Sequence, residues 1–330
     1  MRVLIIGGGA VGQVYGHHLA RAGAQVDVYV KPKYAEEAAR GFVLYPLGRK
    51  SQRKGGADAQ GRARFVPAHV HTRFEDVSQQ AYDQVWLCVS ADAVTDAFAR
   101  EVAQKTGNAT LVLLTPGLED RARFALCGAE ARLVQGAISL ISYQSPLANE
   151  SRPEPGVAYW FPPMSPSPFD GPSALAKPIV EMLRKGGCPA ALRPGTARFA
   201  ASASAIMMPH LVALEGANWS LRGLRKSGEL ALAAQASREA LDIVAKKHGV
   251  APPFARRLVR PFAMRLLLSL APRLVPFDLE TYLRYHFTKV GPQTRLMIRA
   301  YIERGLADHL PVAALTKLQQ TLTAPAASHG

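Results

Sequence analysis

The sequence is poor in cysteine, which excludes a small disulfide-stabilised protein. Its 330 residues include three cysteines, Cys88, Cys127 and Cys188, odd in number and far apart in the chain. Buried free thiols fit this pattern better than disulfides, so we expect a cytoplasmic location. The apolar run in MRVLII is too short for a signal peptide, and no stretch reaches the roughly 18 apolar residues of a membrane span. We therefore expect a soluble chain.

Acidic residues are also scarce, with 25 against 40 lysines and arginines, and the net charge is +15. The segment from Ile243 to Phe277 contains none, although it carries the basic residues Lys246, Lys247, Arg256, Arg257, Arg260, Arg265 and Arg273. Residues 254–277 mix arginines with many apolar residues, and two interpretations stay open. They form core helices whose arginines reach outward to water, or a basic amphipathic surface that contacts a membrane or a partner.

A second basic segment, residues 48–65, is rich in glycine and predicts a surface loop. Neither basic segment contains a motif interleaved with aromatic residues, so we expect no nucleic-acid partner. We also expect no bound metal.

The first 30 residues contain a strand, helix and strand pattern joined by a glycine-rich turn. Residues 2–6 are apolar, residues 11–22 have helical periodicity, and residues 26–30 alternate as a strand does. Between the first two segments, Gly7, Gly9 and Gly12 form the pattern G-x-G-x-x-G. Such glycines permit a tight turn, a close approach of a pyrophosphate and tight packing of helix on strand. We expect a dinucleotide phosphate at the start of the helix, bound by Gly7, Gly9, Ala10, Val11 and Gly12.

The end of the second strand favours NADP over NAD. Units that bind NAD carry an acidic residue there for the ribose hydroxyls, whereas this chain has Lys31 and Lys33. Asp27 lies too early in the strand to reach the ribose. We therefore predict NADP(H) as cofactor, with both lysines near the 2′-phosphate.

The remaining pattern predicts an α/β domain followed by a helical one. Strands are expected at residues 83–89, 110–114, 132–136 and 156–161, helices at 91–105 and 174–185, and a proline-rich loop at 161–173. From Pro194 onward the pattern is nearly all helical. The fold class is thus a Rossmann-type dinucleotide-binding domain, residues 1–192, followed by an all-helical domain, residues 193–330.

The order and spacing of further segments extend over nearly the whole chain. After the opening VLIIGGGAVGQVYGHHLARAGAQVDVYVK come DQVWLCVSADAV, LVLLTPGLED, MPHLVAL, SREALDIVAKKHGV and GPQTRLMIRAYIERGLADHLPV. Together they resemble the ketopantoate reductase family, NADPH-dependent enzymes that reduce a 2-oxo acid. The resemblance implies that Lys31 binds the 2′-phosphate. It also assigns to the cofactor the turns at Val89 and Ser90 and at Pro116 and Gly117.

The same resemblance places the family's catalytic groups on unsuitable residues. Its catalytic lysine falls on Ala200, its two asparagines on Ser204 and Met208, and its substrate-binding serine and glutamate on Thr281 and Gln293. The lysine stabilises the negative charge that develops on a ketone oxygen and supplies the proton, and losing such a donor costs about 3 to 4 kcal/mol. Ketopantoate reduction is therefore not expected.

Two functions remain open for the sequence. In the first, the chain is an NADPH-dependent reductase of a carbonyl or imine compound other than ketopantoate, and a protonated imine would need no lysine. The donors would come from Ser204, His210, Thr281 and Gln293, with Tyr285 and His286 as further candidates. In the second, the chain binds NADP(H) without chemistry and acts as a sensor or interaction module. A small-molecule substrate and a homodimer are the expected partners.

Overall fold

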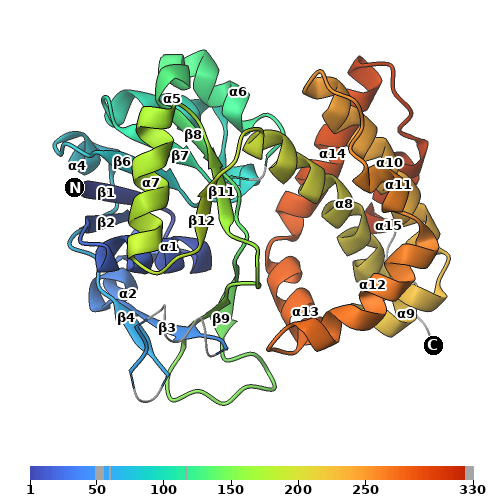
Figure 1. Ribbon diagram of the computed structural model, residues 1–330, viewed down its shortest axis with the longest axis horizontal. Helices are drawn as coiled ribbons and strands as arrows, with labels where there is room; N and C mark the ends of the chain where they lie inside the picture. The colour runs from blue at the N-terminus through green and yellow to red at the C-terminus, as the bar shows by residue number, and fades with distance from the viewer. Residues whose placement is uncertain (49–55, 59–60, 116, 324–330) are drawn as a thin grey trace. The chain divides into compact units, whose positions relative to one another are not determined.

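The computed structural model describes residues 1–48, 56–58, 61–115 and 117–323 (Figure 1). The chain divides into two compact units, Met1–Ala197 and Arg198–Gly330. The first unit combines strands with helices and the second is helical, which confirms the predicted fold class. The division follows Ala197, slightly later than the boundary expected after residue 192.

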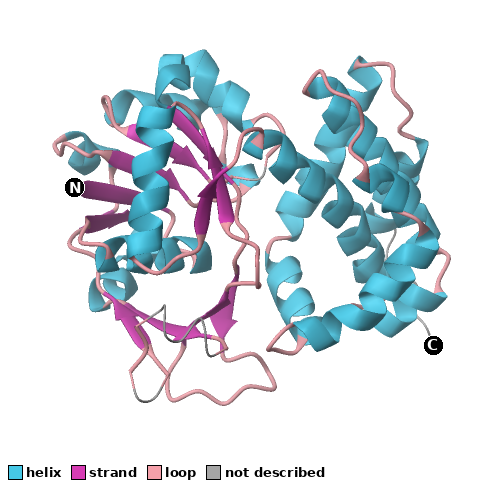
Figure 2. Ribbon diagram, in the orientation of Figure 1, coloured by secondary structure: helices cyan, strands magenta, loops and turns pink. Residues whose placement is uncertain are grey.

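The first unit is built on a large, mostly parallel sheet of eight strands (Figure 2). Its strand order is β12-β11-β8-β7-β6-β1-β2-β5, and the pair β11 and β8 is antiparallel. In chain order these strands are β1 (Arg2–Ile6), β2 (Gln25–Tyr29), β5 (Val70–His71), β6 (Gln84–Leu87), β7 (Thr110–Leu113), β8 (Leu133–Gly136), β11 (Ser167–Asp170) and β12 (Ala190–Leu192).

Alternate side chains of the large sheet enter two separate cores. Val3 and Ile5 of β1 pack into a core with residues of α1 (Ala10–Arg21) and α7 (Ser173–Lys185). Leu4 and Ile6 enter another core with residues of the helices α4 (Phe74–Ser78), α5 (Asp96–Lys105) and α6 (Asp120–Phe124). Because successive side chains of a strand point to opposite faces, apolar residues at every position bury the central strands on both faces.

A second sheet of four strands was not predicted from the sequence. Its order is β4-β3-β10-β9, with the strands β3 (Phe42–Pro46), β4 (Ala63–Phe65), β9 (Ile141–Ser145) and β10 (Gly156–Trp160). The neighbours β3 and β10 lie more than 100 residues apart in the chain, so no local pattern announces their pairing. Figure 2 shows this sheet beside the larger one within the same unit.

Two local predictions need correction. The expected loop at residues 161–173 contains β11. Pro168 has no N–H to donate, but its carbonyl oxygen accepts a hydrogen bond from Ala137 N at 3.0 Å, and this bond joins it to the sheet. The expected helix at residues 91–105 is split into a short 3-10 helix, Ala91–Ala93, and α5. The break follows from Thr95, whose side chain caps α5 by accepting a hydrogen bond from Phe98 N at 3.1 Å.

The second unit is a set of helices. They are α8 (Thr196–Gly216), α9 (Leu221–Lys226), α10 (Glu229–Lys247), α11 (Ala255–Leu258), α12 (Pro261–Leu274), α13 (Leu279–Lys289), α14 (Gly291–Ala307) and α15 (Ala313–Thr323). Buried Glu239 of α10 accepts hydrogen bonds at 3.0 Å from Ala314 N and Leu315 N, and thereby caps α15. The carboxylate at this helix start satisfies backbone donors that have no partner within the helix.

We expected no segment long and apolar enough for a membrane span, and helix α8 is an exception. Its 21 residues meet that test by length and composition, but half of the apolar window is buried inside the protein. Buried residues such as Ala205, Met208 and Leu211 are those of a core helix. The core helix of a soluble protein passes the same test.

Candidate functional site

Four parallel strands of the large sheet have their carboxyl ends along the same edge of the sheet, the edge at which parallel strands finish. β7, β6, β1 and β2 are neighbours in that order, so their carboxyl ends lie side by side. The chain leaves β1 toward β2 on one side, and β6 lies on the other side of β1, which makes this edge a topological switch point. Ligands of open α/β sheets bind at such a point. The predicted cofactor residues of four separate segments thus come to one edge.

The turn after β1 has the geometry that the glycine pattern predicts. Gly7 has a φ of +108°, and a Cβ there would lie 2.5 Å from the carbonyl oxygen of Cys88. A Cβ on Gly12 would lie 2.0 Å from the carbonyl oxygen of Gly7, so helix α1 packs against the turn at that point. Glycine is therefore required at both positions by the protein itself.

Gly9 differs from Gly7 and Gly12 because nothing in the protein crowds it. Apart from its chain neighbours and the backbone of its own helix, no atom of the described residues lies within 4 Å of a Cβ placed on Gly9, and its φ of −73° suits any residue. It is the N-cap residue of α1, whose first turn begins at Ala10 and Val11. An open glycine at a helix start leaves room for a pyrophosphate to approach the backbone. The observation fits a bound dinucleotide, which the residues of the turn would hold.

The turn is braced by a side chain that the sequence analysis did not single out. Gln13 is buried, and its side-chain amide donates a hydrogen bond of 2.8 Å to the carbonyl oxygen of Gly8. The Gly7 N–H donates to the carbonyl oxygen of Tyr29 at 3.1 Å, which joins the turn to the end of β2. The pattern G-x-G-x-x-G-Q was the available signal for Gln13.

The end of β2 presents basic side chains. Lys31 and Lys33 are exposed, on either side of Pro32 in a short 3-10 helix that starts there. The Lys33 ammonium lies 4.9 Å from the centre of the Tyr34 ring, a cation-π contact, and no ion pair of Lys31 is found among the described residues. The first carboxylates beyond them, Glu36 and Glu37, lie on the helix that follows, α2 (Ala35–Arg40).

Asp27 cannot take the place of an acidic ribose ligand. Its side chain is fully buried and accepts hydrogen bonds from Tyr82 Oη at 2.8 Å, His69 Nδ1 at 3.0 Å and Arg2 Nη2 at 3.2 Å. His71 Nε2 lies 3.7 Å from the same carboxylate. The carboxylate is therefore committed to a structural network, as its early position in the strand indicated.

The ends of β6 and β7 supply the other predicted cofactor residues. Val89 and Ser90 are half-buried directly after β6, and Ser90 is the N-cap residue of a 3-10 helix. Gly117 follows β7, and its N–H donates a hydrogen bond of 2.9 Å to Asp120 Oδ2. Pro116 lies outside the described residues.

Asp120 is a buried carboxyl at this edge that the sequence analysis missed. Burial raises its pKa above the ordinary value, while hydrogen bonding from the Gly117 N–H and the charge of Arg123, 3.3 Å away, act in the opposite direction. It holds the backbone of Gly117 in place through that hydrogen bond. An acidic residue three positions after the turn glycine was the available signal.

Two of the predicted catalytic residues lie on α8 in the second unit. Ser204 and His210 are both buried. His210 Nδ1 lies 2.8 Å from the carbonyl oxygen of Ile206, so this nitrogen carries the proton, and Ser237 Oγ lies 3.2 Å from it. His210 Nε2 is buried and has no hydrogen-bond partner among the described residues. Position 200, which the resemblance assigns to the lysine, is Ala200 in the first half of α8, and the helix contains no lysine.

The other predicted catalytic residues lie near the start of α13 and α14. Thr281 is half-buried, and its N–H donates to the Asp278 carboxylate at 2.8 Å, so its backbone is part of a helix cap. Gln293 is half-buried in the first turn of α14. Of the further candidates, Tyr285 is exposed, whereas burial and the nearby charge of Lys289 lower the pKa of His286 to about 4.

We expect the His210 ring to stay neutral at pH 7. Burial lowers its pKa below the ordinary 6.5, against a smaller opposite effect of the hydrogen bond to Ile206. The neutral ring therefore stabilises the fold above pH 6.5, and this contribution is lost as the pH falls through the lowered pKa. Nitrogen-15 NMR of the imidazoles, with His210→Gln to assign the signal, should show a midpoint below 6.5. A midpoint at or above that value would contradict the burial effect.

Comparison with known proteins shows a sequence similarity to one family. Residues 3–149 match the sequence profile of the family described as ketopantoate reductase PanE/ApbA. The matched part is somewhat less than half of the chain. No curated protein matches the chain in sequence. The match covers β1 to β9 and thus every predicted cofactor residue, and it supports an oxidoreductase that uses a nicotinamide dinucleotide.

Solved structures with this fold extend the ketopantoate reductase likeness over almost the whole chain. The PanE/ApbA family ketopantoate reductase from Ralstonia eutropha JMP134 is 18% identical, with 98% of this chain and 97% of that one covered and a TM-score of 0.68. The 2-dehydropantoate 2-reductase from Geobacter metallireducens GS-15 is 15% identical, with 98% and 99% covered and a TM-score of 0.71. D-mandelate dehydrogenase with NADH and anilino(oxo)acetate is 12% identical, with 98% and 97% covered and a TM-score of 0.70. At these identities the likeness shows the fold.

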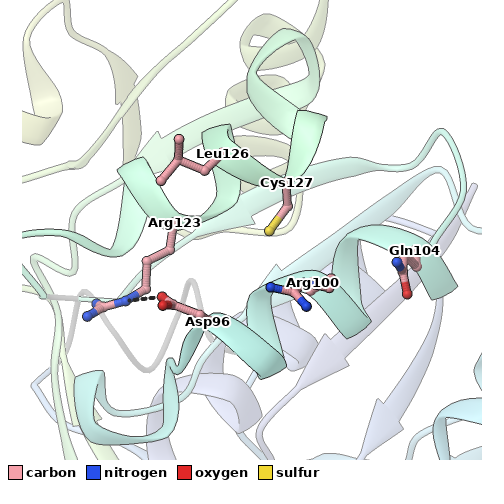
Figure 3. Close-up of a pocket in the computed structure, with 6 residues that line it drawn as sticks. All are labelled: Asp96, Arg100, Gln104, Arg123, Leu126 and Cys127. Carbon is pink, nitrogen blue, oxygen red and sulfur yellow. Dashed lines mark hydrogen bonds and ion pairs between the residues drawn. The ribbon is translucent and has the colours of Figure 1, made fainter.

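A pocket of about 380 Å³ lies elsewhere in the ketopantoate reductase-like unit (Figure 3). It is lined by residues of α5, α6 and the π-helical segment Ala125–Ala129 that follows α6: Asp96, Arg100, Gln104, Arg123, Leu126 and Cys127. The Arg123 guanidinium pairs with the Asp96 carboxylate at 2.9 Å across it. None of the predicted cofactor or catalytic residues lines this pocket, and it adjoins the candidate site only through Arg123, which pairs with Asp120.

Proposed function

We propose that the chain is an NADPH-dependent oxidoreductase that reduces a carbonyl or imine compound other than ketopantoate. The choice of cofactor rests on the side chains at the end of β2. Lys31 is exposed there, whereas Asp27, the acidic residue of the strand, is buried and accepts hydrogen bonds from Tyr82 and His69. A 2′-phosphate suits a lysine at this position and a free ribose hydroxyl suits a carboxylate.

The residues at the sheet edge fit a dinucleotide. The backbone from Gly7 to Gly12 would hold the pyrophosphate at the start of α1, Lys31 and Lys33 would pair with the 2′-phosphate, and the turns after β6 and β7 would border the rest. When bound, the nicotinamide supplies a hydride to the substrate. The chain's own part is to bind and orient the cofactor and to provide a proton.

The identity of the proton donor bears on the substrate class. Helix α8 offers Ser204 and His210 and has no lysine, and the buried His210 ring is neutral near pH 7. A neutral hydroxyl or imidazole stabilises developing negative charge on oxygen less well than an ammonium does. A protonated imine carries its own positive charge, so its reduction needs no such group. This difference favours an imine, or a ketone that gains its stabilisation from several neutral donors such as Ser204, Thr281 and Gln293.

The cofactor assignment is tested by titrating the purified chain with NADPH and with NADH. We expect NADPH to bind more tightly than NADH, and Lys31→Ala to weaken NADPH binding by about tenfold or more while NADH binding changes little, because only NADPH carries the 2′-phosphate. Lys177→Ala, which removes an exposed lysine of α7, is the control and should leave both affinities unchanged. Equal loss for both cofactors in Lys31→Ala would contradict a role at the 2′-phosphate.

The absence of lysine from α8 also supports the second candidate, an NADP(H)-binding protein without chemistry. The two proposals share the binding result and differ in turnover. Oxidation of bound NADPH by any member of a panel of ketones and cyclic imines supports the reductase. Tight NADPH binding with no oxidation across that panel supports the sensor or interaction module.

A further inference from the structure

Large apolar side chains are exposed along the segment from Phe254, just before α11, to Leu274, the last residue of α12. They are Phe254, Leu258, Phe262, Leu266, Leu267, Leu270 and Leu274, and each is between 45% and 76% exposed. The other exposed large apolar residues of the described chain are scattered over many elements. Single exposed apolar residues are ordinary on a soluble protein, whereas a contiguous group marks an interaction site. We call this group the Phe254–Leu274 surface.

Four of the exposed apolar residues of α12 share one face of the helix. Phe262, Leu266, Leu270 and Leu274 follow one another at intervals of four residues, which places them along one side. Of the fourteen residues of α12, all of them described, Met264 alone is buried, and it lies on the opposite side. A surface helix of a globular protein turns its apolar stripe inward. α12 turns an apolar stripe outward.

Positive charge surrounds this apolar face. Arg257, Arg260, Arg265 and Arg273 are exposed in the same segment, and α9, which packs against α12, adds exposed Arg222 and Lys226. No carboxylate occurs from Ile243 to Phe277.

The acidic residues that flank the segment are engaged in other bonds. Asp242 pairs with Arg256, at 2.7 Å from Nη2 to Oδ2, and Asp278 caps α13. The Glu280 carboxylate accepts from Leu221 N at 2.6 Å. Within the described part of the chain, no carboxylate therefore pairs with Arg257, Arg260, Arg265 or Arg273.

We propose that the Phe254–Leu274 surface binds peripherally to an anionic lipid bilayer. Apolar side chains would enter the boundary between head groups and acyl chains, and the surrounding arginines would contact anionic head groups. A second copy of this chain fits less well, because a twofold interface would bring the arginines of both copies together and repel. The membrane supplies both the apolar medium and the opposite charge. This inference does not depend on the proposed reductase activity.

The test is co-sedimentation of the full chain with vesicles. We expect at least about tenfold more binding to phosphatidylcholine vesicles that contain about one-third phosphatidylglycerol than to phosphatidylcholine alone. Raising the salt from about 0.15 M to about 0.5 M should remove most of the binding, because it screens the arginine contribution.

Two pairs of variants separate the surface from general effects of charge and hydrophobicity. Phe262→Ser with Leu266→Ser should reduce binding by about tenfold or more, whereas Leu296→Ser with Leu306→Ser, exposed residues of α14, should not. Arg257→Gln with Arg260→Gln should also reduce it about tenfold. Arg100→Gln with Arg299→Gln removes the same charge from α5 and α14 and should have little effect. All these side chains are exposed, so the fold should survive.

Three results would overturn the proposal. One is an absence of binding to anionic vesicles, or equal binding to neutral ones. Another is equal loss of binding in the control pairs. The third is self-association in ultracentrifugation that Phe262→Ser with Leu266→Ser abolishes, with no vesicle binding, which would make the surface an interface between copies.

Discussion

Replacing Gly12 with alanine is expected to destabilise the first unit by about 3 kcal/mol or more. A Cβ on Gly12 would lie 2.0 Å from the carbonyl oxygen of Gly7 and 3.0 Å from Ile5 Cγ2, so the helix α1 would have to move away from the turn. Overpacking of this kind forces backbone shifts and costs about 1 to 3 kcal/mol, and more where backbone atoms clash. Urea unfolding of the purified variant should show the loss as a lower midpoint.

Gly9→Ala is the matched control for the same turn. It adds the same methyl group where, apart from the chain neighbours and the backbone of its own helix, no atom of the described residues lies within 4 Å and where φ is −73°. We expect its unfolding midpoint to stay close to that of the wild type, while its affinity for both NADPH and NADH falls by about tenfold or more, since both carry the pyrophosphate.

The three variants of the site thus have different signatures. Gly12→Ala loses stability, Gly9→Ala loses both cofactors, and Lys31→Ala loses NADPH selectively. A Gly9→Ala variant that binds both cofactors as well as the wild type would contradict a pyrophosphate at this turn. A Gly12→Ala variant of normal stability would contradict the close packing of α1 on Gly7.

Asp27→Asn is expected to have the second largest effect on stability, about 2 to 3 kcal/mol. The buried carboxylate accepts hydrogen bonds from Tyr82, His69 and Arg2, and an amide presents a donor where acceptors are needed. Leaving buried groups unsatisfied costs about 1 to 3 kcal/mol, and Arg2 and His69 are partly exposed, which keeps the loss below that of a fully buried pair. Glu36→Gln, at an exposed pair with Arg40, is the control and should cost less than about 1 kcal/mol.

The effect of Asp27→Asn should depend on pH. Burial raises the pKa of the Asp27 carboxyl, but the hydrogen bonds from His69 and Tyr82 and the positive charges of His69 and Arg2 outweigh it, and the net pKa is lowered. The carboxylate therefore stabilises the fold fully above its unfolded pKa of about 3.9, and this stability is lost as the pH falls through the lower folded pKa. Urea unfolding between pH 7 and pH 3 should show the wild type and Asp27→Asn converging at the acid end. A constant difference down to pH 3 would contradict the lowered pKa.

The part of the fold that follows from local sequence was predictable. The turn from Gly7 to Gly12, the helix α1 and the strand β2 each carry their own periodicity, and the structure places them within a residue or two of the expected bounds. The small sheet was missed because β3 and β10 pair across more than 100 residues. β11 was missed because the prolines of FPPMSPSPFD predict a loop. The strand forms nevertheless, since Pro168 pairs through its carbonyl and needs no N–H there.

In the candidate site, too, the residues indicated by local sequence were predictable and those that depend on tertiary contacts were not. Lys31 could be named because it lies at the end of one strand, and its role at the 2′-phosphate stays a prediction. The burial of Asp27 agrees with setting that residue aside. Asp120 was missed, since its importance comes from burial and from a bond to Gly117, which the three-residue spacing alone does not reveal. The catalytic assignments to Ser204, His210, Thr281 and Gln293 stay predictions, because they depend on a substrate that the sequence does not name.

The division of the chain after Ala197 has an evolutionary consequence. Every residue assigned to the nucleotide precedes it, and every candidate proton donor follows it. The two cores under the large sheet are made entirely from the first unit, so changes in α8, α13 or α14 leave the packing of the nucleotide-binding half intact. Substitutions in these helices can therefore accumulate by drift or selection while the packing of the first unit is inherited unchanged.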